Sequence, residues 1–191
     1  DQKFGPSMRG LKWVNFGGGH LMTRKGYDVD HLIQILQNFK KRHNIHVILE
    51  PGSAFAWETG YLVSTVLDVV ENKGIKTAIL DVSITSHMPD CLEMPYKPRI
   101  MGSYFDPVAS KPTYRMGGNS CLAGDYFGDW SFDAPLKPGD HIIFEDMIHY
   151  TMVKTTFFNG VQHPSIGIWS DKEGFRLVRK FGYEDYMNKL S

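Results

Sequence analysis

The sequence lacks a net charge, a cysteine framework and any long apolar run. Its 191 residues include 21 basic and 21 acidic side chains, so overall charge gives no support for a nucleic acid or another polyanion as partner. Two cysteines, Cys91 and Cys121, cannot form a disulfide framework, and a reducing cytoplasm is the simplest interpretation. No run of 18 apolar residues predicts a membrane span, and no secretory apolar segment opens the chain.

The sequence does contain enough apolar and aromatic material for a core and a lined pocket. Hydrophobic residues make up 42% of the chain and aromatic residues 13%. The length suits one large domain or parts of two. Near residues 55–60 the pattern changes from helical periodicity to β-rich runs. We therefore predict an α/β part over residues 1–58 and a β domain over residues 59–191.

The α/β part is organised around a glycine triplet. An apolar, strand-like run at residues 12–16 leads directly into Gly17, Gly18 and Gly19. Residues 28–43 predict an amphipathic helix, because apolar side chains recur at helical spacing and basic residues close the last turn. Residues 45–49 are a short apolar run typical of a buried parallel strand. This order predicts one right-handed strand–helix–strand unit.

Such a unit does not make a stable α/β domain by itself, because its strands are apolar on both faces and need neighbours on each side. We expect it to be the last part of a larger parallel sheet or barrel, and the chain to be a C-terminal piece, a processed chain or an incomplete one.

The second part reads as an antiparallel β domain. Strand-like runs separated by turn residues occupy residues 61–70, 76–84, 139–144, 150–158, 165–169 and 175–178. No long helical pattern separates them, which favours antiparallel pairing. Residues 181–190 predict a short terminal helix.

Two features of the α/β part suggest chemistry. Consecutive glycines after a buried strand let backbone N–H groups approach an anion closely, as in phosphate-binding turns. The alternative is a tight turn without a ligand. Glu50, followed by Pro51, Gly52 and Ser53, lies where α/β barrels place catalytic groups. A carboxylate there can keep a pyridinium nitrogen protonated, although a solvated glutamate at a strand end is the simpler alternative.

Three features of the β part are further candidates. Cys121 and Asp125 lie in a loop of small residues, where a buried structural thiol is the alternative to a reactive one. Asp90 and Glu93, in a loop bounded by prolines, suit a cationic aliphatic substrate, or are incidental acids of a solvated loop. Tyr150 follows a strand, where its hydroxyl could reach a phosphate; the alternative is a buried tyrosine with a local partner.

No metal site is predicted. The histidines and cysteines show no spacing typical of zinc ligands, so the histidines are interpreted as packing or hydrogen-bonding residues.

Taken in order, these motifs resemble one family. Asn-Phe-Gly-Gly-Gly-His, Leu-Glu-Pro-Gly-Ser, His-Met-Pro-Asp, Glu-Met-Pro-Tyr, Gly-Gly-Asn-Ser-Cys-Leu-Ala-Gly-Asp, His-Tyr-Thr and Phe-Phe-Asn-Gly are similar to motifs of the alanine-racemase-fold pyridoxal-phosphate decarboxylases. The similarity extends from about residue 11 to 169 and is greatest to members that act on carboxynorspermidine or carboxyspermidine in polyamine synthesis.

The resemblance implies a fold, a cofactor and partners. The family fold is a (β/α)₈ barrel followed by a β domain, working as a head-to-tail homodimer with shared sites. The first part of this chain would then hold the last strands of the barrel, whose remainder lies outside it. Pyridoxal 5'-phosphate would be the cofactor and a cationic carboxylated polyamine the substrate.

The resemblance also implies residue roles. The cofactor phosphate would be held by Gly17, Gly18, Gly19, Gly52, Ser53 and Tyr150. Glu50 would pair with the pyridine nitrogen. Cys121 would protonate the decarboxylated carbon. Cys121 and Asp125 would reach the site of the neighbouring subunit, where Asp125 would contact the substrate. Asp90 or Glu93 would meet the distal amines of the substrate.

Three departures from the family pattern stand out. Ser53 occupies a position where related decarboxylases often carry arginine, so the phosphate loses a charged partner. Leu122 stands where ornithine-type relatives carry aspartate, which argues for a substrate longer than ornithine. No lysine matches the early barrel-strand motif that binds the cofactor aldehyde. Alternatives therefore stay open: a diaminopimelate, arginine or ornithine decarboxylase, a non-catalytic regulatory homologue, or a β-rich binding domain with an incidental glycine turn.

Overall fold

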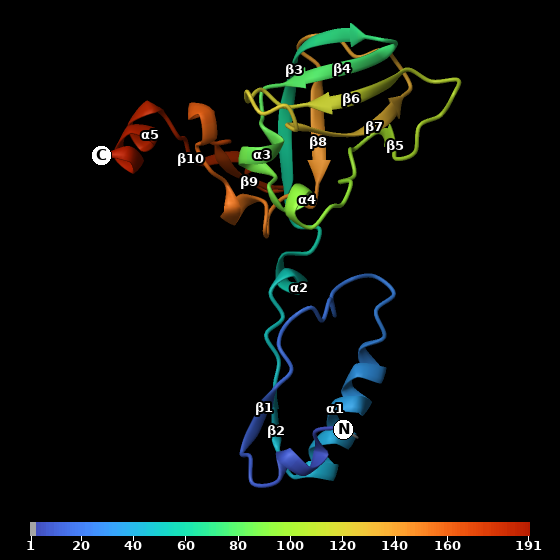
Figure 1. Ribbon diagram of the computed structural model, residues 1–191, viewed down its shortest axis with the longest axis vertical. Coiled ribbons are helices and arrows are strands. Elements are labelled where there is room, and N and C mark those ends of the chain that lie inside the picture. Colours follow the sequence, from blue (N-terminus) through green and yellow to red (C-terminus); the bar gives the residue numbers. More distant parts are fainter. Residues whose placement is uncertain (1–2) are drawn as a thin grey trace. The chain divides into compact units, whose positions relative to one another are not determined.

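The chain divides into two compact units, Asp1–Trp57 and Glu58–Ser191, in the computed structural model, which describes residues 3–191 (Figure 1). We describe each unit by itself. No helix within residues 3–191 is long and apolar enough to span a membrane.

The first unit is the predicted strand–helix–strand motif. After a short 3₁₀ turn, η1 (Gly5–Met8), strand β1 (Trp13–Asn15) pairs in parallel with β2 (His46–Ile48), and helix α1 (Val29–His43) connects them. The Asp28 carboxylate accepts a hydrogen bond from the His31 N–H at 2.8 Å and caps α1. The helix ends at Asn44, whose φ of 50° is left-handed.

This unit leaves much apolar surface open. No residue of α1 is buried, and its Ile33 and Ile35 are 43% and 49% exposed. On the strands, Trp13 is 57% and Ile48 is 42% exposed. Apolar side chains left exposed on a parallel strand pair and on its helix favour packing against further strands and helices. A single turn of helix, α2 (Ser53–Ala56), closes the unit.

The second unit is built on a curled six-stranded sheet in the order β5-β7-β6-β4-β3-β8. Its long strands are β3 (Tyr61–Asn72), β4 (Ile75–Leu80), β6 (Thr113–Gly117), β7 (Tyr126–Phe132) and β8 (His141–Glu145), with the short edge strand β5 (Ser103–Tyr104). Strand β3 pairs with β8 through its first half and with β4 through its second half, and a register shift separates Val66 from Asp68. This bulge accompanies the curl of the sheet.

The strand pairs are antiparallel as predicted, with one exception. Strands β4 and β6 are parallel, with Ala78 opposite Met116. Parallel neighbours need a long crossover, and residues 81–112 provide it. The crossover carries the short helices α3 (Ile84–His87) and α4 (Asp90–Glu93). The predicted strand at residues 76–84 was therefore too long: it ends at Leu80, and Ile84 opens α3 after the capping residue Ser83.

Two further predictions need correction. Residues 150–158, predicted as a strand, contain the 3₁₀ turn η2 (Met152–Lys154) and lead into η3 (Phe158–Gly160). Residues 114–117, read as part of a loop, belong to strand β6. In both places the tertiary setting outweighs local propensity.

A hydrophobic core fills the curl of the sheet. Trp130, Phe144, Leu80 and Met116 are fully buried there, and Ile84 and Met88 of the crossover pack into the same cluster. The crossover helices are thus anchored by apolar burial, the main stabilising term of a core.

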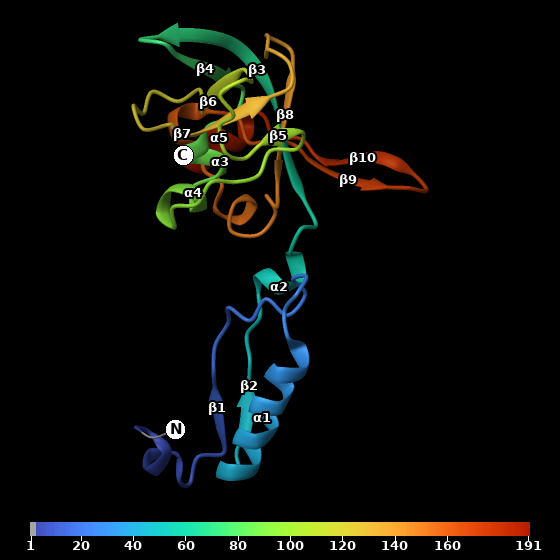
Figure 2. The same cartoon turned by 90° about the vertical axis from the view of Figure 1, so that its right-hand side faces the viewer.

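The chain ends with an antiparallel ribbon, β9 (Ile166–Ser170) and β10 (Gly174–Arg179), followed by helix α5 (Tyr183–Leu190). These elements lie close to the predicted ranges. Figure 2 shows the ribbon projecting from the rest of its unit.

Candidate functional site

The three glycines of the triplet meet two local structural requirements. Gly17 and Gly19 have φ values of 72° and 84°, which L-residues with side chains rarely adopt. At Gly18 an added Cβ would lie 2.7 Å from the carbonyl oxygen of Glu50, closer than real Cβ contacts come. The turn therefore requires glycine both for its backbone conformation and for the approach of the neighbouring chain.

The triplet offers unused backbone donors. The Gly17 N–H donates to the Asn15 side-chain oxygen at 2.7 Å. The N–H groups of Gly18 and Gly19 meet no hydrogen-bond partner within residues 3–191. Free N–H groups in a turn beside a sheet end are suited to an anion. The residues present thus fit a phosphate group.

Glu50 lies directly beside this turn. Its backbone N–H donates to the Gly17 carbonyl at 2.8 Å, which extends the β1–β2 ladder to the triplet. Its carboxylate is exposed, and one oxygen accepts a hydrogen bond from the Asn15 side-chain amide at 2.5 Å. The structure therefore brings together two predicted parts of the site, the glycine turn and an available carboxylate.

Gly52 and Ser53 begin helix α2, just after Glu50. Ser53 is half-buried, and the following Ala54 is buried. The Thr23 hydroxyl donates to the Ala54 carbonyl. This bond ties the loop after the glycine triplet to the turn at Gly52 and Ser53.

In the second unit, Asp125 is buried and serves as the hub of two loops. One carboxylate oxygen accepts from the Thr85 N–H at 2.8 Å and from the Ser83 hydroxyl at 3.2 Å, and the other from the Ser120 N–H at 3.0 Å. Burial alone would raise the pKa of Asp125, but these donors outweigh it and hold the pKa below its usual range. Both oxygens are thus occupied by the protein.

Cys121 lies in the loop that Asp125 closes. The side chain is exposed, whereas Cys91 in α4 is buried and its pKa is raised to about 11 by burial. Neither cysteine is in a disulfide. The Cys121 N–H donates to the side-chain oxygen of Asn159 at 3.0 Å. Of the two thiols, Cys121 is the one available for chemistry.

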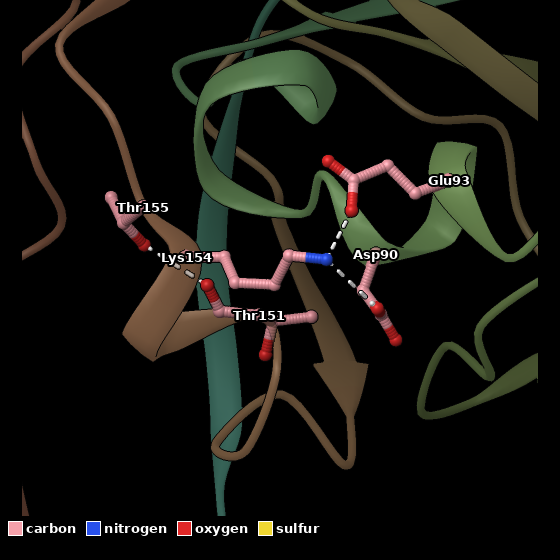
Figure 3. A network of polar contacts seen from close by, with 5 residues as sticks. All are labelled: Asp90, Glu93, Thr151, Lys154 and Thr155. Carbon is pink, nitrogen blue, oxygen red and sulfur yellow. Dashed lines mark hydrogen bonds and ion pairs between the residues drawn. The ribbon is translucent and has the colours of Figure 1, made fainter.

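Asp90 and Glu93 share one cation. Figure 3 shows the Lys154 ammonium reaching from η2 toward both carboxylates of α4. Its Nζ lies 3.3 Å from an Asp90 oxygen and also contacts Glu93. The hydrogen bond to Glu93 is the main reason why the pKa of Lys154 is raised. The Asp90 side chain is 10% exposed and that of Glu93 is 58% exposed, so Glu93 presents the more accessible charge.

Tyr150 is 52% exposed at the start of the segment that carries Lys154. The predicted alternative of a buried tyrosine therefore does not apply.

A histidine network supports the crossover. The Ser83 hydroxyl caps α3 by accepting from the Ser86 N–H at 3.1 Å, and His87 Nδ1 accepts from the Ser83 N–H at 3.2 Å. Burial, followed by repulsion from His163, lowers the pKa of His87 to about 4. His163 stacks on Phe157 with ring centroids 3.6 Å apart. His87 is thus neutral at pH 7. Within residues 3–191, no group of three or more His, Cys, Asp or Glu side chains could hold a metal ion.

Sequence reasoning missed three residues of these networks: Asn15, Lys154 and Asn159. Asn15 ends a strand whose parallel partner leads to Glu50. The predicted pairing of these two strands could therefore have indicated that Asn15 lies beside Glu50. The Asn159-Gly160 dipeptide is typical of a turn. Nothing local marks Lys154, because its two acids lie more than sixty residues away in the sequence.

Comparison with known proteins gives the context of this geometry. Residues 27–148 match the family described as pyridoxal-dependent decarboxylase, C-terminal sheet domain. Over 191 residues the chain is 54% identical to a carboxyaminopropylagmatine decarboxylase of Synechocystis sp., covering 100% of this chain and 49% of that protein. A carboxynorspermidine/carboxyspermidine decarboxylase of Campylobacter jejuni is 44% identical, with 97% of this chain and 51% of that protein covered. The chain thus spans about half the length of these curated relatives.

Solved structures agree with these matches. The crystal structure of carboxynorspermidine decarboxylase from Campylobacter jejuni, complexed with norspermidine, has a TM-score of 0.88 and 43% identity; 98% of this chain and 54% of that chain are covered. A diaminopimelate decarboxylase from M. jannaschii has a TM-score of 0.73 at 22% identity, over 98% of this chain and 44% of that chain, and is similar in fold.

Proposed function

The chain belongs to the pyridoxal-dependent decarboxylases, and from this premise we propose that the complete protein is a carboxy-lyase that uses pyridoxal 5'-phosphate to decarboxylate a carboxylated polyamine, carboxynorspermidine or carboxyspermidine. The products would be norspermidine or spermidine. The observation that carries the proposal is the geometry at Gly18 and Glu50. Unpartnered backbone N–H groups and an exposed carboxylate lie together at one end of a parallel strand pair.

The residues of the first unit fit the two polar ends of such a cofactor. Gly17, Gly18 and Gly19, with Gly52 and Ser53, would hold the phosphate through backbone donors, and Tyr150 would add its hydroxyl. No basic side chain takes part in this set, so binding would depend on the directed N–H groups. Glu50 would accept a hydrogen bond from the pyridinium N–H, and Asn15 would keep the carboxylate oriented.

Pyridoxal 5'-phosphate, when bound, supplies an electron sink for the electron pair released by loss of CO₂. Glu50 would stabilise the protonated ring nitrogen, because a carboxylate favours a positive charge beside it. The Cys121 thiol would deliver a proton to the carbon that loses the carboxylate, as an exposed thiol is able to do. Asp125 would hold the Cys121 loop. Its burial and its internal donors support this role more than the direct substrate contact implied by the family resemblance.

Substrate selection would depend on Asp90 and Glu93. The substrates named for the relatives are cationic, and acids in a recognition loop attract cations. Lys154 already supplies one positive charge to these two acids. The remaining negative charge would therefore act mainly through the exposed carboxylate of Glu93, and one distal ammonium would match it.

A second candidate substrate is carboxyaminopropylagmatine, favoured by the relative that is 54% identical. Its agmatine part ends in a guanidinium, which binds a carboxylate with two parallel hydrogen bonds. Glu93 suits either terminal group. The structure of residues 3–191 therefore favours a cationic chain end without choosing between ammonium and guanidinium.

We further propose that the enzyme is a cytoplasmic homodimer with shared sites, in which Cys121 reaches the site of the neighbouring subunit. The family resemblance supports this assembly. The lysine that binds the cofactor aldehyde would lie in the barrel portion outside residues 1–191. The share of the relatives that the chain covers supports that division.

The experiment is to purify the complete protein, record its visible absorbance for bound pyridoxal 5'-phosphate, and measure CO₂ release. Carboxynorspermidine, carboxyspermidine, carboxyaminopropylagmatine, ornithine and diaminopimelate would be supplied separately at equal concentration. We expect the largest kcat/KM with one of the three carboxylated polyamines. A preference for ornithine or diaminopimelate would overturn the substrate class, and a protein without the cofactor would overturn the enzymatic proposal altogether.

A further inference from the structure

The segment from Met152 to Gly160 connects parts of the second unit that are far apart in the sequence. Lys154 contacts Asp90 and Glu93 of α4, and the Thr156 N–H donates to the Ser86 carbonyl of α3 at 2.8 Å. Further along, Asn159 accepts from the backbone of Cys121. The segment thus holds both the crossover loop and the Cys121 loop.

Asn159 has a backbone conformation that few residues tolerate. Its φ and ψ are 57° and 15°, in the left-handed region, and Gly160 follows with φ of 70°. Asparagine is among the residues that enter this region most readily. The turn is closed by the Gly160 N–H, which donates to the Phe157 carbonyl at 2.8 Å. The side-chain oxygen of Asn159 is therefore displayed from a defined turn.

Cys121 has little else to hold it. Residues 121–124 are all exposed, so no side chain of this stretch is buried in the core. The bonds within the loop join its two ends: the Ser120 N–H donates to the Asp125 carboxylate at 3.0 Å, and the Asp125 N–H donates to the Leu122 carbonyl at 2.9 Å. Among the described residues, the bond to Asn159 is the one that joins the Cys121 backbone to another segment.

We propose that Asn159 is a positioning residue for Cys121, fixing the peptide that carries the thiol so that its proton reaches the correct carbon. The inference rests on the proposed function, in which Cys121 is the proton donor. Without the Asn159 oxygen, the exposed residues 121–124 would sample several positions. Cys121 would then more often deliver its proton to the cofactor instead of the substrate carbon. Hydrolysis by water would then leave the substrate as an aldehyde and its amino group on pyridoxamine phosphate.

Two variants of the complete protein separate the side chain from the backbone. Asn159→Gly removes the acceptor oxygen but keeps the left-handed turn, and Asn159→Asp keeps both an acceptor oxygen and tolerance of that turn. The matched control is Asn44→Gly, because Asn44 is also left-handed, with φ of 50°, and ends helix α1 of the first unit. Cys121→Ala serves as the benchmark for a lost proton donor.

The first readout is amide hydrogen exchange at Cys121, which needs no cofactor. Loss of one hydrogen bond of ordinary net strength should speed this exchange roughly fivefold in Asn159→Gly, whereas Asn159→Asp and Asn44→Gly should keep the wild-type rate. The second readout is the fraction of turnovers that yield aldehyde. This fraction should rise in Asn159→Gly toward that of Cys121→Ala and return to near the wild-type value in Asn159→Asp.

Unchanged exchange at Cys121 in Asn159→Gly would overturn the proposal, because the bond would not be holding the loop. Faster exchange with wild-type products would also overturn it, provided that Cys121→Ala misdirects the proton. If Cys121→Ala itself gave normal products, the role of Cys121 in the proposed function would fail and the positioning role with it. The exchange data would still distinguish that failure from the loss of the hydrogen bond.

Discussion

The side-chain amide of Asn15 donates to the carboxylate of Glu50 across 2.5 Å, joining the end of β1 to the residue that follows β2. The same Asn15 accepts from the Gly17 N–H through its side-chain oxygen. One side chain therefore orients both the carboxylate and the first glycine of the triplet. The two halves of the proposed cofactor site in this unit are linked through Asn15.

Replacing Glu50 by Gln should separate cofactor chemistry from folding. Gln keeps the size and an oxygen for Asn15 but loses the charge that stabilises a protonated ring nitrogen, so kcat should fall about 10²-fold or more. Steady-state kinetics of the complete protein and circular dichroism would check this. Glu71→Gln, at the exposed end of β3, should behave as wild type. Undiminished turnover in Glu50→Gln would remove Glu50 from the mechanism.

Gly18→Ala should weaken cofactor binding. The added Cβ would lie 2.7 Å from the Glu50 carbonyl, so the two strand ends must move apart. Overpacking of this kind costs about 1–3 kcal/mol. If cofactor binding bears this cost, pyridoxal 5'-phosphate should bind roughly 5- to 150-fold more weakly in a fluorescence titration. Gly182→Ala is the matched control, because a Cβ there meets nothing within 4 Å. Equal affinity in the two variants would show that the triplet does not form the phosphate turn.

Lys154→Met should destabilise the protein more than Lys111→Met does. Lys154 neutralises the nearly buried Asp90, whereas the partner of Lys111, Asp133, has a side chain that is 71% exposed. An unpaired buried carboxylate is costly, while a surface ion pair contributes little. Thermal melts of the complete protein at pH 7 should give a Tm about 2 °C or more lower for Lys154→Met than for Lys111→Met. Equal melting temperatures would mean that Asp90 does not need its cation.

The histidine network predicts a loss of stability in mild acid. His87 has a folded pKa of about 4 against an ordinary value of 6.5, because burial and His163 disfavour its charged form. Below about pH 6.5 the unfolded chain therefore binds a proton at His87 that the folded chain does not bind. The stability then falls by about 3 kcal/mol as the pH approaches 4. The lowered pKa of His163 acts in the same direction.

His87→Gln should remove most of this dependence, since Gln keeps an oxygen for the Ser83 N–H but does not titrate. Urea unfolding between pH 4.5 and 7 is the measurement. His141→Gln, at an exposed position on β8, should retain the wild-type slope. A wild-type slope in His87→Gln would place the pH dependence elsewhere.

The regular elements with strong periodicity were predictable from the sequence. Helix α1 and the strands β1, β2 and β3 lie within a few residues of their predicted bounds, because amphipathic spacing and apolar runs are local signals. The hairpin turn between β3 and β4 was also readable. Lys73 and Gly74 both have positive φ, the conformation of a two-residue hairpin turn.

The parts that escaped prediction depend on distant contacts. Residues 150–158 are rich in β-branched and aromatic side chains, which favour a strand. Instead, the Lys154 ammonium binds Asp90 of α4 and the Thr156 N–H donates to Ser86 of α3, so the backbone forms a turn. The triplet and Glu50 were recognised as candidate site residues, but the bond from Asn15 depends on strand pairing, which no single segment encodes.

The parallel pairing of β4 with β6 has a consequence for how this fold can diversify. A parallel neighbour is out of reach of a tight turn, so the chain must make an excursion over residues 81–112 before it can return. That excursion contains Asp90 and Glu93 and is anchored in the core by Ile84 and Met88. In the proposed function, mutations at Asp90 and Glu93, which follow these anchors, would alter which cation is accepted without changing a strand partner. The crossover would then allow substrate selection to change while the sheet stays the same.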